Sequence, residues 1–275
     1  MKQNKTYKLG ISTTVDYSIS VEKLFKVFAD NEFDFVSLGS SLKQTGFFDR
    51  DEFKSIITLA NDNGLEIMSA HAPFGGEYDI ASPDHNIHEE AIDHHLRFIE
   101  NAAEYGIPMV IIHPHHYFLD SKEACLERSA RALEMIRLSQ PDSVRLLIEN
   151  LPAAEGSWIC NMLLGIFDET AYGWCYDCSH ENISGPPFHL LSHYYNRLET
   201  SHLSDNMGQY DEHLVPGDGN IGWEKLKSFF DLADNIDHML LEVGTGEPLT
   251  EPIDDFVRRA SDRIRALLET TAPEN

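Results

Sequence analysis

Short apolar runs rich in β-formers alternate along the chain with longer segments whose apolar residues recur every three to four positions. The short runs predict strands and the longer, amphipathic segments predict helices. Eight strands are predicted at residues 8–12, 33–38, 65–71, 109–113, 145–149, 173–177, 198–203 and 239–242. Helices are predicted at residues 21–30, 50–63, 87–105, 122–138, 157–167, 188–195, 223–233 and 253–268.

Helix stop signals support this division. Asn63-Gly64 and Gly106-Ile107-Pro108 each end a helical pattern just before a predicted strand. Eight strand–helix units in 275 residues predict an α/β protein with a single (β/α)8 TIM-barrel domain over residues 1–275, with flexible ends at 1–6 and 270–275. The alternative is an open doubly wound sheet. That fold usually carries a glycine-rich phosphate loop after the first strand, where this chain has Ser-Thr-Thr-Val-Asp, so the barrel is favoured.

The ends of the predicted strands carry the candidate chemistry. In such a barrel the C-terminal ends of the strands converge on one mouth. Predicted strands three to eight end at or beside residue types that bind metals: His71, His113, Glu149, Asp177, His202 and Glu242. The spacings Asp177-x-x-His180 and Asp211-x-His213 add three further candidates. Nine candidate ligands can serve two or three divalent ions, or one ion and a ring of substrate-binding groups.

The remaining histidines and the cysteines are interpreted as structural positions without a catalytic role. His115 and His116 are interpreted as rim positions that shape the pocket. His88, His94 and His95 fall in a helix pattern and are assigned no catalytic role. Cys175-x-x-Cys178 lacks the second such pair that a zinc ribbon needs, and it is interpreted as two small residues flanking Asp177 on a strand. A mixed histidine and carboxylate shell suits Zn²⁺, Mn²⁺ or Co²⁺.

Several ordered motifs carry a family resemblance. They are Ser69 to Pro73 (SAHAP), Ile80 to Pro83 (IASP), Tyr105 to Pro108 (YGIP), Val110 to Pro114 (VIIHP), Leu147 to Asn150 (LIEN), Asp177-x-x-His180, His202-Leu203-x-Asp205, Asp211-x-His213 with Pro216-Gly217-x-Gly219, and Leu241-Glu242. As an ordered set they resemble the xylose isomerase-like TIM-barrel superfamily, which also contains the second family of apurinic-site endonucleases. The resemblance implies a site for one to three divalent ions, Mn²⁺ or Zn²⁺.

The resemblance implies different ion counts in the two branches. In the endonuclease branch, the equivalents of His71, His113, Glu149, Asp177, His180, His202, Asp211, His213 and Glu242 hold three zinc ions. In the isomerase and epimerase branch, the equivalents of Glu149, Asp177, His202 and Glu242 hold one ion, and the equivalent of His180 contacts the substrate. All these residue types are present in this chain.

The leading hypothesis is a metal-dependent isomerase or epimerase acting on a ketose or related polyol. Glu149 would remove a proton and Glu242 would return one, or the reverse, as the catalytic pair. The predicted substrate-binding residues are His180, His71, His113 and Trp223, and the candidate aromatic walls are Phe47, Phe48, Phe74 and Trp223. One alternative is a metal-cluster phosphodiesterase in which Glu149 bridges two ions. The other is a metal-binding barrel without catalysis.

Charge and hydropathy limit the partners. The chain has 46 acidic and 21 basic residues, a formal net charge of −25. A strongly acidic surface repels a phosphate backbone, so nucleic acid is disfavoured and a small sugar or polyol is the expected partner. Apolar runs of four to five residues predict no membrane span, and MKQNKTYKLG has no signal-peptide apolar core. With four cysteines, a cytoplasmic location is expected. The sequence neither requires nor excludes a homo-oligomer.

Overall fold

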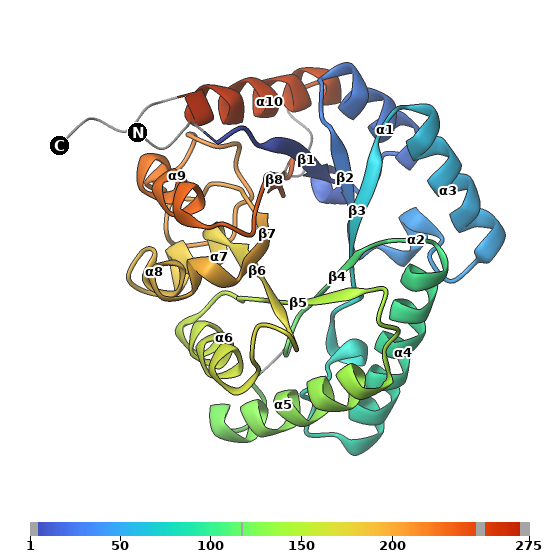
Figure 1. Cartoon of the computed structure of the whole chain (residues 1–275), viewed down its shortest axis with the longest axis vertical. Coiled ribbons are helices and arrows are strands. Elements are labelled where there is room, and N and C mark those ends of the chain that lie inside the picture. Colours follow the sequence, from blue (N-terminus) through green and yellow to red (C-terminus); the bar gives the residue numbers. More distant parts are fainter. Residues whose placement is uncertain (1–4, 117, 246–250, 270–275) are drawn as a thin grey trace.

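The computed structural model describes residues 5–116, 118–245 and 251–269. Eight strands form one sheet whose paired neighbours run parallel. A bridge between Leu203 and Leu241 joins its two edges, so the sheet closes into a barrel (Figure 1). The predicted (β/α)8 barrel is confirmed. The strands are β1 (Lys8–Ser12), β2 (Phe35–Leu38), β3 (Glu66–His71), β4 (Met109–Ile112), β5 (Arg145–Glu149), β6 (Gly173–Asp177), β7 (Leu198–His202) and β8 (His238–Leu241).

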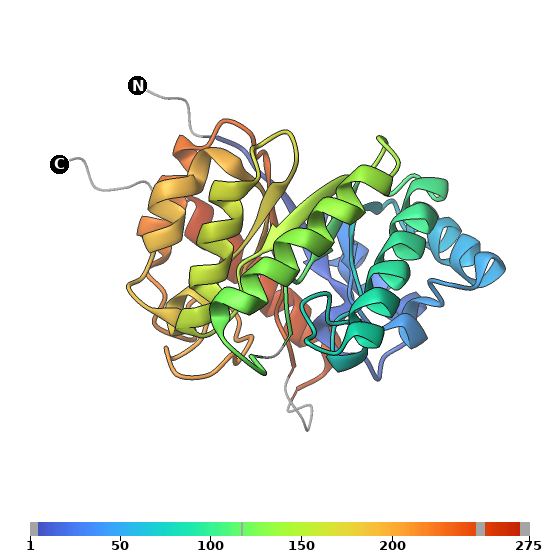
Figure 2. The same ribbon diagram turned by 90° about the horizontal axis from the view of Figure 1, so that it is seen from below.

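Helices surround the barrel and cover its outer face (Figures 1 and 2). They are α1 (Val21–Asp30), α2 (Leu42–Thr45), α3 (Arg50–Asp62), α4 (His85–Glu104), α5 (Lys122–Ser139), α6 (Ala154–Ile166), α7 (Cys178–Ser184), α8 (His189–Tyr194), α9 (Trp223–Leu232) and α10 (Ile253–Glu269). The sequence did not predict α2 or α7. Both are too short to show an apolar period, and each begins at a side-chain cap, Ser41 for α2 and Asp177 for α7.

Alternation along the strands separates the barrel interior from the layer under the helices. Val110, Ile112, Leu146 and Ile148 belong to the main core beneath the helices. Their neighbours on β4, β5 and β6 form a separate buried cluster: Met109, Ile111, Leu147 and Cys175. Because side chains on a strand alternate between faces, this inner series continues upward to His113, Glu149 and Asp177. The core packing of the strands therefore fixes which side chains reach the barrel mouth.

The described part of the chain begins at residue 5 and ends at residue 269. Of the ends predicted to be flexible, residues 1–4 and 270–275 lie outside the described residues. Lys5 is described, and its Nζ donates a hydrogen bond to the carbonyl oxygen of Ala233, 2.7 Å away. Among the described helices, none is long and apolar enough to cross a membrane.

Candidate active site and metal centre

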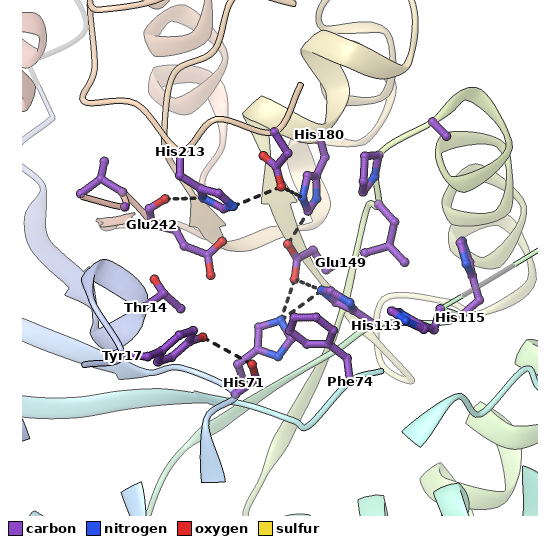
Figure 3. A pocket seen from close by; sticks show the side chains of 18 of the residues that line it. Thr14, Tyr17, His71, Phe74, His113, His115, Glu149, His180, His213 and Glu242 are labelled. Atoms are coloured by element: carbon purple, nitrogen blue, oxygen red, sulfur yellow. Dashed lines mark hydrogen bonds and ion pairs between the residues drawn. The ribbon is translucent and has the colours of Figure 1, made fainter. Parts of the chain in front are cut away.

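Glu149 stands at the centre of the side chains gathered at the barrel mouth (Figure 3). Its Oε2 lies 3.1 Å from Nε2 of His71 and 3.2 Å from Nε2 of His113. Its Oε1 lies 2.9 Å from Nδ1 of His202. Burial alone raises the pKa of Glu149, but the neighbouring His202 and His113 outweigh burial and hold it well below its ordinary value. Glu149 is therefore ionised and shared between two groups of imidazoles.

Four of the predicted ligands form one compact group: Glu149, Asp177, His202 and Glu242 each offer a donor atom within 4.8 Å of the others. Nδ1 of His202 lies 3.1 Å from Oε2 of Glu242. Asp177 is fully buried, and its Oδ2 has no hydrogen-bond partner among the described residues. Burial raises the pKa of Asp177 to about 7, and the charges of Asp211, Glu149 and Glu242 add to this shift while His180 opposes it. Three crowded carboxylates with one unpartnered oxygen fit a divalent cation.

Three other histidines are oriented by backbone carbonyl groups. Nδ1 of His71 lies 2.7 Å from the carbonyl oxygen of Ala72, and Nδ1 of His180 lies 2.8 Å from that of Asn150. Nδ1 of His213 lies 2.9 Å from the carbonyl oxygen of Glu242. A carbonyl only accepts, so each Nδ1 carries a hydrogen, and Nε2 is the nitrogen left to face the mouth, where it can bind a metal ion once it is deprotonated. Metal-binding histidines are typically held in this way.

Asp211 joins His180 and His213 into a further donor group. Its Oδ2 lies 3.0 Å from Nε2 of His180 and 3.1 Å from Nε2 of His213. His213 has a left-handed backbone, with φ of 50°, a conformation that is uncommon outside glycine and concentrates at functional sites. Burial lowers the pKa of His213, but Asp211 and Glu242 outweigh it and raise the pKa to about 10. The structure thus brings all nine predicted ligands to one mouth.

Two side chains that the sequence did not assign to the site support it from below. Asn150 binds the backbone of Asp177 twice: its Nδ2 donates to the carbonyl oxygen and its Oδ1 accepts from the N–H. Cys175 lies in the buried layer under the mouth, where its sulfur comes within 4.8 Å of donor atoms of Glu149 and His202. The motif Cys175-x-x-Cys178 is split between β6 and α7, since Cys178 is the first residue of α7.

Asp205 and Trp223 are engaged with each other rather than with the mouth. The carboxylate of Asp205 accepts hydrogen bonds from the backbone N–H groups of Asn206, Gly217 and Ile221 and from Nε1 of Trp223. Trp223 is buried in the main core, and the structure does not place it among the residues that line the pocket. Asp205 therefore fixes the loop after β7.

Of the other predicted aromatic walls, only Phe74 reaches the pocket. It is 43% exposed and stacks on His113, with ring centroids 4.4 Å apart. Phe47 is buried against Phe98, and Phe48 packs on the outer side of the same pair. The wall predicted from four aromatic residues is thus supplied by one of them.

The pocket over these groups has a volume of about 550 Å³. Both rim histidines, His115 and His116, line it, as predicted. Loop residues that the sequence did not single out complete it, because loop positions carry no periodic signal: Thr14, Tyr17, Ser40, Phe118, Leu151, Pro152, Ala153, Val243 and Gly244. Among the described lining residues there is neither a lysine nor an arginine.

Comparison with known proteins places the chain within one family of folds. A family model for the xylose isomerase-like TIM barrel matches residues 25–271. The uncharacterized protein MJ1311 of Methanocaldococcus jannaschii is 25% identical over 242 residues, covering 80% of this chain and 79% of that protein. Two solved structures are similar in fold. A D-tagatose 3-epimerase-like protein has a TM-score of 0.78 at 21% identity, covering 95% of this chain and 97% of its own. The IOLI protein with a bound zinc atom has a TM-score of 0.81 at 14% identity, covering 95% and 98%.

Proposed function

Because the chain belongs to the xylose isomerase-like TIM-barrel family, we propose that it is a divalent-metal-dependent isomerase or epimerase of a ketose or related polyol. One observation carries the proposal: the carboxylates of Glu149 and Glu242 both contact the imidazole of His202. They do so beneath a pocket whose described lining contains no lysine or arginine. Solved structures of similar fold include a D-psicose 3-epimerase in the presence of D-fructose and an L-ribulose 3-epimerase, which supports a small sugar as substrate.

Glu149, Asp177, His202 and Glu242 would hold the ion, which when bound supplies a Lewis acid that polarises a substrate carbonyl and acidifies the neighbouring C–H. Glu149 is kept ionised by its imidazole neighbours, so it can accept that proton. Glu242 returns a proton from the other side, and the two roles exchange in the reverse reaction. A change of face gives an epimer, and a proton returned to the adjacent carbon gives an isomer.

The surrounding side chains orient the sugar. The ring of His180 is held by its Nδ1–H bond to Asn150, so its Nε2 faces Asp211 and the pocket at a fixed angle. Phe74 presents an exposed ring face on which the C–H groups of a sugar can pack. His71 and His113 lie beside Glu149 and can bind a substrate oxygen there.

Solvent-proton exchange tests this proposal. Protein stripped of metal and reloaded with Mn²⁺ or Zn²⁺ should incorporate deuterium from D₂O into D-fructose, D-tagatose or D-psicose, as followed by NMR. The variant Glu242→Gln should lower the exchange rate by about 10²–10⁴-fold, the usual contribution of a general acid or base. Glu90→Gln, on the exposed side of α4, is the matched control and should exchange at the wild-type rate. Full activity of Glu242→Gln would contradict the proton-transfer role.

A second candidate, a metal-cluster phosphodiesterase, is favoured by one observation, the separate donor group of His180, Asp211 and His213. It predicts three bound ions per chain and hydrolysis of bis(p-nitrophenyl) phosphate or cleavage of abasic DNA. His213→Ala should abolish that hydrolysis, whereas it should leave ketose exchange within about tenfold of wild type. If the metal-loaded protein shows neither exchange nor hydrolysis, the metal-binding barrel without catalysis is the hypothesis that remains.

A further inference from the structure

Helix α8, in the outer ring of helices, carries a pair of histidines (Figure 1). His189 and His193 are four positions apart, and no other two of the 14 histidines in the sequence have this spacing. Both residues are exposed, and neither lines the pocket at the barrel mouth. Residues four apart on an α-helix face the same side, and two histidines at this spacing can bind one metal ion, as in the H-E-x-x-H motif.

The two rings lie at the separation that a shared ion requires. Their centroids are 4.8 Å apart and their planes are inclined by 60°. An imidazole nitrogen binds Zn²⁺ at about 2.0–2.1 Å, which puts the ring centroid roughly 3.2 Å from the ion. Two such rings separated by about 90–110° at the ion have centroids roughly 4.5–5.2 Å apart. The observed separation falls within this range, so one ion can bind both rings without a change in the helix.

The ring of His193 is held by its own helix. Its Nδ1 lies 2.7 Å from the carbonyl oxygen of His189 and 3.2 Å from Oγ of Ser192. A carbonyl only accepts, so Nδ1 carries a hydrogen, and Nε2 is the nitrogen that can bind an ion once it is deprotonated. A bond from the second ring nitrogen to a carbonyl group is the usual support of a metal-binding histidine.

The position of α8 is fixed from below. The carboxylate of Glu181 is buried, and it accepts hydrogen bonds from the backbone N–H of Leu190 and the hydroxyl group of Tyr176. Leu190 and Leu191 pack in the main core. The two histidines therefore project from an anchored helix, which reduces the conformational freedom that is lost when an ion binds.

We propose that His189 and His193 form a metal site, separate from the barrel mouth, for a late first-row divalent ion such as Cu²⁺, Ni²⁺ or Zn²⁺. Imidazole nitrogen suits these ions, whereas Mg²⁺ and Mn²⁺ prefer oxygen ligands. The two imidazoles supply two ligands, and water on the exposed side completes the shell. This ion adds one to the number of ions per chain, so a count for the barrel mouth needs a protein whose α8 binds none.

Ion counting tests the proposal. Untagged protein is dialysed to equilibrium against Cu²⁺ near pH 8, because a ligating imidazole must be neutral. Glycine in the buffer competes for the ion and keeps it off isolated surface imidazoles. Wild type should bind one Cu²⁺ per chain more than His189→Gln or His193→Gln. His85→Gln is the matched control, because exposed His85 has Glu89, not a second histidine, four positions on. Its count should equal that of wild type.

Retention on a resin with immobilised Cu²⁺ is an independent measurement, because a resin-bound ion cannot reach the buried histidines of the mouth. Each of the two α8 variants should elute at a lower imidazole concentration than wild type and His85→Gln, with an unchanged Tm in EDTA. Equal copper counts in wild type and both α8 variants, or equal retention of all four proteins, would overturn the proposal. A loss in His85→Gln as large as in His193→Gln would do the same, since single exposed imidazoles would then account for the binding.

Discussion

Replacing Asp177 by asparagine should stabilise the metal-free protein and weaken its response to metal. Oδ1 of Asp177 accepts the backbone N–H of His180 at 2.7 Å, while Oδ2 is buried with no hydrogen-bond partner among the described residues and lies 3.7 Å from Nδ1 of His180. In Asp177→Asn the amide oxygen can keep the bond to His180. The NH₂ group then replaces a negative oxygen at a point surrounded by the carboxylates of Glu149 and Glu242, which can accept from it.

The size of the effect follows from the charge that is removed. An unsatisfied buried polar group costs about 1–3 kcal/mol, and more when charged, so the metal-free variant should gain about 1–3 kcal/mol near pH 8. For a chain of this length that corresponds to a Tm increase of roughly 2–5 °C. The metal response should shrink, because losing a charged ligand weakens binding by at least about 100-fold. At a fixed saturating concentration, this removes about 2.7 kcal/mol of the stabilisation by metal.

The gain should depend on pH in a defined direction. The pKa of Asp177 is raised from 3.8 to about 7 in the folded protein, so the native state holds the proton more tightly than the unfolded chain. Asp177 therefore favours the native state at acidic pH, and this contribution is lost as the pH rises from about 4 to about 7. The variant lacks this loss, so its advantage should be small at pH 4.5 and largest at pH 8.

Unfolding by guanidinium chloride, followed by tryptophan fluorescence at both pH values with EDTA or Mn²⁺, measures these quantities. Asp205→Asn is the matched control, because Asp205 is also buried at this end of the barrel but accepts four hydrogen bonds. That variant should lose stability at both pH values and keep its metal response. A metal-free Asp177→Asn that is less stable than wild type at pH 8, or that responds fully to Mn²⁺, would refute the reasoning.

Two further changes address residues outside the metal centre. Trp223→Phe removes the indole N–H that binds Asp205 and should cost about 1–2 kcal/mol of unfolding free energy. The KM of this variant should stay within twofold of wild type, because Trp223 does not line the pocket, and a larger change would contradict that placement. Burial lowers the pKa of His95 to about 4, so the metal-free protein should lose about 1–3 kcal/mol as the pH falls from 6.5 to 4. His95→Asn keeps a donor for the carbonyl oxygen of Ala91. Denaturant unfolding at pH 7.5 and pH 5 should show a smaller loss of unfolding free energy in this variant than in wild type. An unchanged loss would mean that another group causes the pH dependence.

The parts of the site that could be predicted from sequence are those that strand geometry dictates. His113, Glu149 and Asp177 follow apolar inner positions at intervals of two, so a barrel prediction places them at the mouth together. Trp223 could not be placed in this way. Its position depends on a hydrogen bond to Asp205, 18 residues earlier, and sequence spacing does not encode that contact.

The shared position of Glu149 determines which experiments can separate the candidate reactions. Glu149 contacts the His71 and His113 pair through one oxygen and His202 through the other, so the sugar reaction and the phosphoester reaction both need it. Its replacement tests the site without choosing between the reactions. The choice must come from groups that only one reaction uses, and these are His213 and Asp211, which form a separate ligand group in the phosphoester reaction. A loss of hydrolysis in His213→Ala with ketose exchange retained therefore carries more information than the loss of both activities in Glu149→Gln.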